Sequence, residues 1–361
     1  MTMKKRGLLF VTLCLTLLVT LLASACTSSP APSAPQTSAS TPQASTKVFE
    51  WKLQPYLPET DPSVSKNVDH LIEMINTNTS GSVKIKKFPA GSICPGGEVL
   101  NAVSSGTLDM AVSIGGYNSG AIPSAAVEDG LPLQWTNLRQ MTEVIWDYGF
   151  EDLLRPEYEK QGVYLLGLYE SGGTGAQIFT RTAINTLDEL KGKKIRTWGK
   201  FLTLMEKIGA SPVSMPLGEV YSALQMGALD GVLIVTAVVK PNKFYEVVPF
   251  GLLPQFGWGA THSAFINPKK WNELPADLKT IVRLTFNDWK AWNARYYNPR
   301  NNYVTIQEVQ KMGVKMTNLS AADFARVQKA ASDIWDEEAA KNPVSAKLIE
   351  IVRKQMKDVP E

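Results

Sequence analysis

The order of apolar and polar positions predicts alternating strands and helices along most of the chain. Residues 48–53 begin as a strand, and residues 82–88 alternate as a strand with one solvent-facing side does. Between them, apolar residues recur at helical spacing: Val64, Val68, Leu71, Ile72 and Ile75. Further strands are expected at residues 108–114, 163–168, 194–197, 231–239 and 263–266. This alternation predicts an α/β fold with largely parallel sheets.

One segment is echoed later in the chain. Residues 98–109 read EVLNAVSSGTLD, and residues 219–230 read EVYSALQMGALD. Each predicts an amphipathic helix, a glycine that ends it in a left-handed conformation, and a Leu-Asp pair that leads into a strand. The simplest architecture is therefore two related α/β domains. The alternative is that helix–glycine–strand turns are common, and one echo does not prove duplication.

The C-terminal third is mainly helical in its pattern. Pro275 and Asp277 open an apolar stripe that continues towards Gly313, which at ~1.5 Å per residue would make a helix of roughly 55 Å. Pro299 lies inside this stripe and should kink the helix or divide it in two. A later helix is opened by the capping box that starts at Ser320.

The first 26 residues have the pattern of an export signal. A basic start at residues 4–6 precedes the apolar run from Leu8 to Leu22, and Ala23 and Ala25 suit a signal peptidase. The alternative is a transmembrane anchor, but the apolar run is somewhat short and small residues follow it.

Cys26, directly after this cut, resembles the lipobox cysteine of bacterial lipoproteins, which implies that it is diacylated. Ala23 stands where leucine is more usual, and residues 23–25 would also suit an ordinary signal peptidase that releases a soluble protein. Residues 27–47 are rich in Ser, Pro and Thr and cannot bury a core, so they predict a loose tether. A tether favours the lipid-anchored alternative.

Composition and charge exclude several classes of protein. The net charge is only +3 and the basic residues are dispersed, which does not predict nucleic-acid binding. Cys94 is the one thiol of the predicted folded region, so no internal disulfide is expected there. His70 and His262 lie beside no Cys or carboxylate cluster, which disfavours a transition-metal site or a catalytic triad. His262 remains a lesser candidate for a pocket residue.

Several ordered motifs resemble the solute-binding subunits of TRAP transporters, the DctP type. They are LDELKGKKIR at 187–196, GASP at 209–212, EVYSALQMGALDG at 219–231 and KFYEV at 243–247, with GSVKI at 81–85, FPAG at 88–91 and SGTLDM at 105–110 upstream. The resemblance covers roughly residues 48–340, and the matching order of the motifs makes it far more specific than any one of them.

The resemblance implies a two-domain, periplasmic-binding-protein-like fold of type II, with a hinge and a long domain-spanning helix. Domain I would comprise residues 48–172 and 259–299, and domain II residues 173–258 and 300–361 with the C-terminal helices. Closure of the domains would bury a small organic carboxylate, and a TRAP permease would recognise the closed form. No cofactor is implied, and we expect an exported monomer because the domains must move.

Arg196 matches the carboxylate-binding arginine of the family, and its planar guanidinium can pair with both oxygens of a carboxylate. Ile234, in an apolar run, is a second ligand-binding candidate. Weaker candidates lie beside predicted strand ends, where clefts of open α/β sheets form: Tyr117, Tyr169, Glu170, Trp198 and Trp258. The alternative for each aromatic is core packing.

The chain departs from the family at three places. Residues 173–177 lack the second arginine of many members, and residues 232–235 are apolar where sugar-acid binders carry an asparagine. These departures predict a monocarboxylate with an apolar or aromatic body. Val232 and Leu233 stand where metal-assisted members place a carboxylate and a tryptophan, so no sodium or calcium is expected.

Two other functions remain open. An exported hydrolase would need a nucleophile with its base, but no Gly-x-Ser-x-Gly elbow and no His–Glu metal motif is present, so we expect no catalytic residue. A ligand sensor without a transport role cannot be distinguished by sequence. The glycine-rich residues 171–175 lack the Lys-Ser/Thr ending of a phosphate loop, which predicts a flexible crossover instead.

Overall fold

The computed structural model describes residues 47–59, 65–296 and 306–358. These residues belong to one compact unit that extends from Ser45 to Glu361. The predicted signal segment, the tether and Cys26 lie outside the described residues and stay predictions. None of the described helices is both long and apolar enough to cross a membrane.

The described strands form one mixed sheet of ten strands in the order β2-β1-β3-β9-β4-β7-β5-β6, with β8 beside β4 and β10 beside β8. Their bounds are β1 Phe49–Pro55, β2 Val83–Lys87, β3 Met110–Ile114, β4 Tyr164–Thr180, β5 Lys194–Arg196, β6 Ser211–Val213, β7 Gly231–Val235, β8 Phe250–Leu253, β9 Gly257–Ile266 and β10 Lys315–Asn318.

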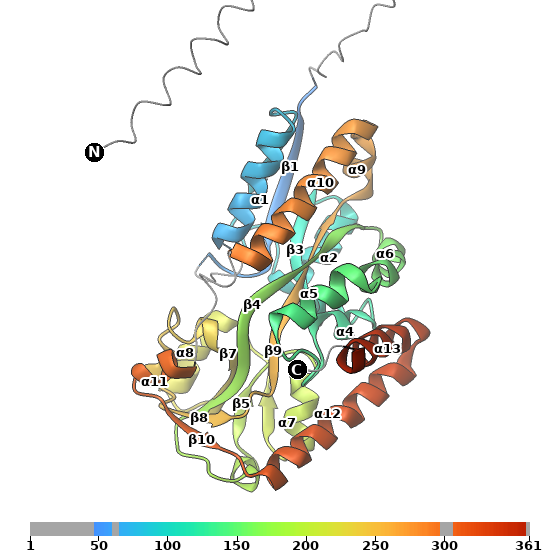
Figure 1. Cartoon of the computed structure of the whole chain (residues 1–361). Helices are drawn as coiled ribbons and strands as arrows, with labels where there is room; N and C mark the ends of the chain where they lie inside the picture. The colour runs from blue at the N-terminus through green and yellow to red at the C-terminus, as the bar shows by residue number, and fades with distance from the viewer. Residues whose placement is uncertain (1–46, 60–64, 297–305, 359–361) are drawn as a thin grey trace, which may run out of the picture. The chain divides into compact units, whose positions relative to one another are not determined.

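The sheet has two halves joined by two long strands (Figure 1). We call β2, β1 and β3 the first half-sheet, and β7, β5, β6, β8 and β10 the second half-sheet. Strands β4 and β9 pair with each other, β9 also pairs with β3, and β4 also pairs with β7 and β8. The largely parallel sheet of the prediction is correct only within the half-sheets. The four pairings that involve β4 or β9 are antiparallel, because the chain crosses between the halves as strands rather than through helices.

The glycine-rich segment predicted as a crossover lies inside β4. The pairing of β4 with β9 shifts its register between Ser171 and Gly175. Such irregularities re-aim a strand locally. The segment therefore lies in a strand that joins the two half-sheets, and its role as a flexible crossover between domains stays a prediction.

Helices cover both half-sheets. Around the first lie α1 Ser65–Asn78, α2 Val99–Ser105, α3 Gly115–Asn118, α4 Ala125–Asp129, α5 Leu138–Asp147, α6 Phe150–Lys160, α9 Pro268–Glu273 and α10 Ala276–Trp292. Around the second lie α7 Phe201–Lys207, α8 Leu217–Gln225 and α11 Ile306–Lys311. Gly106 and Gly227 end their helices at φ 85° and 78°, as the echoed segments predict. The Ser320 hydroxyl accepts from the Asp323 amide at 3.0 Å, which confirms that predicted cap.

The predicted stripe after Pro275 forms two described helices. α10 has 17 residues, about 25 Å at ~1.5 Å per residue, and packs on α1 and β4. α11 follows after residues that the structure does not describe, Pro299 among them. Two further helices together reach both half-sheets. α12 Ala321–Lys341 packs on α7 beside the second, and α13 Pro343–Asp358 packs on α4, α5 and α6 beside the first.

Two apolar cores stabilise the sheet. The larger includes Trp51, Phe265 and Trp289 and extends from the first half-sheet across β4 to α7 and α12. The smaller lies on one face of the second half-sheet, around Val232 and Phe244. Strand β7 alternates between them because successive side chains of a strand point to opposite faces.

Candidate functional site

Arg196 is the last residue of β5, between β7 and β6 in the second half-sheet. Its side chain is buried, with 6% of its surface exposed. Nε and Nη2 both donate to the backbone oxygen of Met215, at 3.1 and 3.0 Å. A guanidinium has five N–H donors, so the other donors are available to a second acceptor.

Two tyrosines from the first half-sheet approach Arg196. Tyr56 follows β1, and Tyr117 lies in α3 with its ring edge-on to Tyr56 at 5.5 Å between centroids. Burial lowers the pKa of Arg196, whereas the phenol groups of Tyr117 and Tyr56 act in the opposite direction. The arginine of one half-sheet therefore lies near aromatic side chains of the other.

His262 extends this cluster into the first half-sheet. Its Nε2 lies 2.8 Å from the Tyr56 hydroxyl, and its ring packs edge-on against Tyr56 and Tyr169. Burial lowers the pKa of His262 to about 3, so the imidazole is neutral at physiological pH. Nδ1 has no hydrogen-bond partner within the described residues. Tyr169 is fully buried between His262 and Trp289, which is the core position considered as its alternative.

Ile234 lies on the same face of the second half-sheet as Arg196. Val232 of β7 is opposite Arg196 in β5, and Ile234 is two residues further along that strand. Gln177 of β4 lies opposite Ile234. Gln177 is 2% exposed, and its Oε1 has no partner among the described residues. A buried amide oxygen on the same face of the sheet as Arg196, two strands away, is thus available to a ligand or water.

The two predicted tryptophans lie near the junction of the half-sheets. Trp198 is half-buried two residues after Arg196, and its ring centroid is 5.0 Å from that of Phe201. Trp258 of β9 is opposite Gly175, where the register of β4 shifts. Its indole N–H has no partner in the described parts of the chain. Trp258 therefore combines an apolar face with an available donor.

Glu170 has different neighbours from the other candidates. It is fully buried, and burial raises its pKa to about 7, opposed by the charge of Lys290 and reinforced by that of Glu151. Its backbone oxygen accepts from Asn293 Nδ2 at 2.8 Å. These partners belong to α6 and α10 and the residues that follow, so the structure places Glu170 with this group rather than with Arg196.

Sequence reasoning missed Tyr56, Gln177, Asp129 and Thr197. The side-chain oxygens of Asp129 and Thr197 are buried without a hydrogen-bond partner among the described residues. Tyr56 could have been found, because it follows a predicted strand as Tyr117 does. The other three become notable only through their tertiary burial, which residue type alone does not predict.

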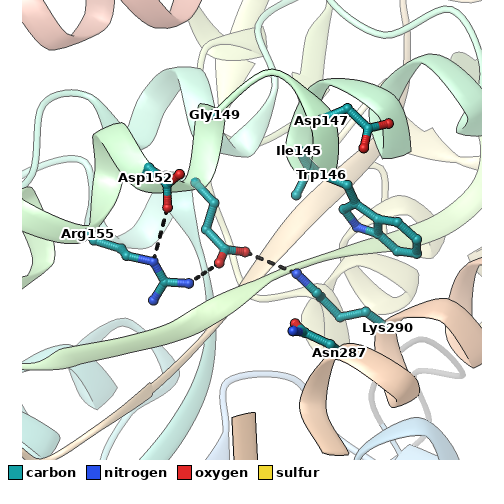
Figure 2. A pocket seen from close by; sticks show the side chains of 9 residues that line it. Ile145, Trp146, Asp147, Gly149, Asp152, Arg155, Asn287 and Lys290 are labelled. Atoms are coloured by element: carbon teal, nitrogen blue, oxygen red, sulfur yellow. Dashed lines mark hydrogen bonds and ion pairs between the residues drawn. The ribbon is translucent and has the colours of Figure 1, made fainter. Parts of the chain in front are cut away.

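The structure has a hollow away from Arg196, with a volume of about 650 Å³ (Figure 2). Four of its charged residues already pair with one another: Glu151, Asp152, Arg155 and Lys290. Glu151 accepts from Arg155, from Lys290 at 3.3 Å and from the Leu168 amide at 2.8 Å, and Asp152 lies 3.5 Å from Arg155. Through Glu151 of α6, these contacts connect Lys290 of α10 with Leu168 of β4, so we assign the hollow a structural role.

No three His, Cys, Asp or Glu side chains converge as metal ligands in residues 47–59, 65–296 and 306–358. The expectation of no bound sodium or calcium stays a prediction.

Comparison with known proteins gives a consistent result. The family model described as bacterial extracellular solute-binding protein, family 7 (DctP), matches residues 55–342. A monocarboxylate 2-oxoacid-binding periplasmic protein of Nostoc is 26% identical over 326 residues, which cover 87% of this chain and 86% of that protein. The 2,3-diketo-L-gulonate-binding periplasmic protein of Escherichia coli is 28% identical over 58% of this chain and 63% of its own length.

Solved structures share the fold. A TRAP transporter solute-binding protein of Bordetella bronchiseptica, with calcium and picolinate bound, has a TM-score of 0.76 at 23% identity and covers 86% of this chain and 93% of its own. One from Pseudoalteromonas atlantica, with sodium and pyruvate, has a TM-score of 0.75 at 21% identity, with 86% and 95% covered.

Proposed function

Because this chain belongs to the DctP family of bacterial extracellular solute-binding proteins, we propose that it captures a small monocarboxylate at Arg196 for a TRAP permease. Proteins of this family are extracytoplasmic and bind small organic acids. The proposal adds the site and the kind of acid.

The main support for this function is that Arg196 is a buried cation with no acidic side chain paired to it among the described residues. The side chains that influence its charge are the phenols of Tyr117 and Tyr56, and its hydrogen bonds go to the backbone oxygen of Met215. No Asp or Glu among the described residues forms an ion pair with it. A buried cation without a counter-charge is strongly unfavourable, whereas a ligand carboxylate would neutralise it and accept from its remaining donors.

The surroundings of Arg196 favour an apolar or aromatic body on the ligand. Tyr117, Trp258 and Ile234 supply apolar surface. The polar groups on the same sheet face or in the neighbouring aromatic cluster, Gln177 and the Tyr56–His262 pair, are neutral. Neutral donors and acceptors suit a carbonyl or hydroxyl group better than a second carboxylate. The Nostoc relative, which binds monocarboxylate 2-oxoacids, makes this class the first to test.

We further propose that the ligand is held by closure of two domains, residues 48–172 with 259–299 and residues 173–258 with 300–361. Arg196 belongs to the second and Tyr56 and Tyr117 to the first, which supports a site shared between them. The packing of α13 on α4, α5 and α6 means that the C-terminal helices connect both domains. Lipidation of Cys26, a monomeric state and the absence of catalysis complete the proposal.

A thermal-shift screen tests the binding function. We would compare pyruvate, phenylpyruvate, benzoate, succinate and galacturonate on the wild type, on Arg196→Ala and on the control Arg181→Ala, which alters an exposed arginine of the same domain. A ligand at a hundred times its Kd stabilises the native state by about 2.7 kcal/mol. The proposal expects a shift with a monocarboxylate that survives in Arg181→Ala and disappears in Arg196→Ala.

Other outcomes would change the conclusion. A shift retained in Arg196→Ala would move the site elsewhere, and galacturonate or succinate as the tightest ligand would overturn the proposed class of acid. Turnover of any acid would favour a hydrolase. Co-purification with a receptor instead of a permease would favour a sensor.

A further inference from the structure

Asp129 is a buried acid that the proposed ligand site does not use. It is the last residue of α4 and is 2% exposed. Neither carboxyl oxygen has a hydrogen-bond partner among the described residues. An ionised carboxylate buried without a partner is so unfavourable that such a group takes up a proton instead.

Two glycines from opposite half-sheets enclose this carboxyl. Gly116 lies in α3 of the first half-sheet, and Gly199 lies three residues after Arg196 in the second. A Cβ placed on Gly116 would lie 2.7 Å from Asp129 Oδ2, and one on Gly199 would lie 2.5 Å from the same oxygen. The Gly116 Cβ would also lie 3.6 Å from the Gly199 Cα. At this carboxyl, each half of the molecule therefore contributes the backbone of a glycine, with no side chain between that backbone and Asp129 Oδ2.

The charged groups near Asp129 do not offer it a cation. Burial raises the pKa of Asp129 well above its ordinary value; an ionised Glu128 on the same helix would raise it further, whereas the backbone N–H of Gly116 acts in the opposite direction. Lys200 follows Gly199, but its Nζ lies 2.7 Å from Glu338. Among the elements that pack on α4, β9 contributes the neutral His262 and α3 contributes Tyr117. The buried residues of α13 are uncharged: Ser345, Leu348, Ile349, Val352 and Gln355.

We propose that Asp129 is a proton-binding latch between the two domains, so that ligand capture takes up a proton at this carboxyl. In the closed protein the carboxyl is protonated between Gly116 and Gly199. Opening withdraws Gly199, water reaches the carboxyl, and the proton returns to solution as the pKa falls towards the ordinary value of about 3.9. This inference rests on the proposed closure around a carboxylate.

The sign of the pH dependence follows from this cycle. Closure binds the proton, so affinity is greatest at low pH and falls as pH rises, by up to tenfold per pH unit between the open-state and closed-state pKa values. Glu128 also has a raised pKa, about 8, but it accepts from Tyr158 at 2.8 and 2.9 Å within the first domain. Closure leaves those contacts intact, so Glu128 should keep its proton in both states.

Calorimetry in two buffers of different ionisation enthalpy measures the proton count directly. The probe is whichever acid of the thermal-shift panel binds most tightly, titrated at about pH 7.5, where even an exposed imidazole with its ordinary pKa of about 6.5 is about nine-tenths neutral. We expect wild type to take up as much as one proton per ligand. Asp129→Asn keeps the size of the side chain without its titration and should bind the acid with no uptake. Glu128→Gln, the matched control, should behave as wild type does.

Two results would overturn the latch: ligand binding without proton uptake in wild type, or equal uptake in Asp129→Asn. If no acid binds, the proposed ligand class fails, and the latch is decided on the ligand-free protein by small-angle scattering at several pH values. Because the closed state binds the proton, wild type should become more compact as pH falls whereas Asp129→Asn should not change, and the same pH response in both proteins would overturn the latch as well.

Discussion

Arg196 and Met215 are joined by a pair of hydrogen bonds, in which Nε and Nη2 of the guanidinium converge on one backbone oxygen at 3.1 and 3.0 Å. This contact fixes the plane of the guanidinium before any ligand arrives. Because a preorganised group loses little conformational freedom on binding, the contact should contribute to affinity without touching the ligand.

The first prediction concerns the shape of this cation. Arg196→Lys keeps the charge but cannot bind Met215 and a carboxylate with one planar group. Loss of a hydrogen bond to a charged group costs about 1.5–3 kcal/mol, so we expect Kd to rise by about 10- to 100-fold. Isothermal titration calorimetry measures the Kd of both proteins, with Arg181→Lys as the control. Equal affinity in Arg196→Lys and wild type would show that charge alone suffices.

The second prediction concerns the Tyr56–His262 hydrogen bond of 2.8 Å. Tyr56→Phe removes the hydroxyl and leaves a buried imidazole nitrogen unsatisfied, which should lower the free energy of unfolding by about 1–3 kcal/mol. Tyr164→Phe is the matched control, because Tyr164 stacks on Trp271 at 4.4 Å through its ring face. Urea unfolding of both variants makes the comparison, and equal losses would argue against the hydrogen bond as the cause.

The third prediction is acid destabilisation through His262. Its pKa is about 3 in the folded protein, against an ordinary value of about 6.5. The unfolded chain therefore binds the proton first. The stability due to the neutral imidazole is complete above pH about 6.5 and is lost as pH falls towards 3, at up to about 1.4 kcal/mol per pH unit. His262→Gln should flatten this part of the curve in urea unfolding, and an unchanged slope would contradict the assignment.

The fourth prediction tests the approach of the two domains. Gly116 has an ordinary negative φ, so alanine fits its backbone, but the added methyl would meet Asp129 and come close to Gly199. We expect Gly116→Ala to weaken ligand binding by about 5- to 100-fold, since overpacking costs about 1–3 kcal/mol. Gly120→Ala is the control, because nothing lies within 4 Å of its added Cβ. Small-angle scattering should show that Gly116→Ala stays open with ligand. A normal closure would refute the role of this contact.

Much of the fold follows from local sequence patterns. The echoed segments place Gly106 and Gly227 correctly, because a helix C-terminus needs a residue that tolerates positive φ. The cap at Ser320 is equally local. The antiparallel crossing of β4 and β9 was not predicted, since residues 164–180 pair with residues far along the chain and no local pattern records that pairing.

The residues of the candidate site also fall into those that a sequence pattern indicates and those that only the structure reveals. Arg196 was found through its motif, and Tyr117 through its place at a strand end. Asp129 and Gln177 were not found, because their distinction is an unsatisfied buried oxygen, a property that only the packed protein has. That Glu170 contacts the ligand, as its place at a strand end suggests, stays a prediction. The rule places the residue near the junction but does not say which side its carboxyl takes, and here its charged neighbours are Lys290 and Glu151.

The pairing of β3 with β9 also constrains how the chain can fold during synthesis and export. Residues 110–114 pair with residues 262–266, so β3, the edge strand of the first half-sheet, lacks its partner β9 until more than half of the chain has emerged. Strands β5, β6 and β7 lie within residues 194–235 and can associate earlier. Because contacts between distant residues form slowly, the emerging chain leaves the edge of β3 unpaired until β9 is made, and this edge is where wrong strand pairing is most to be expected.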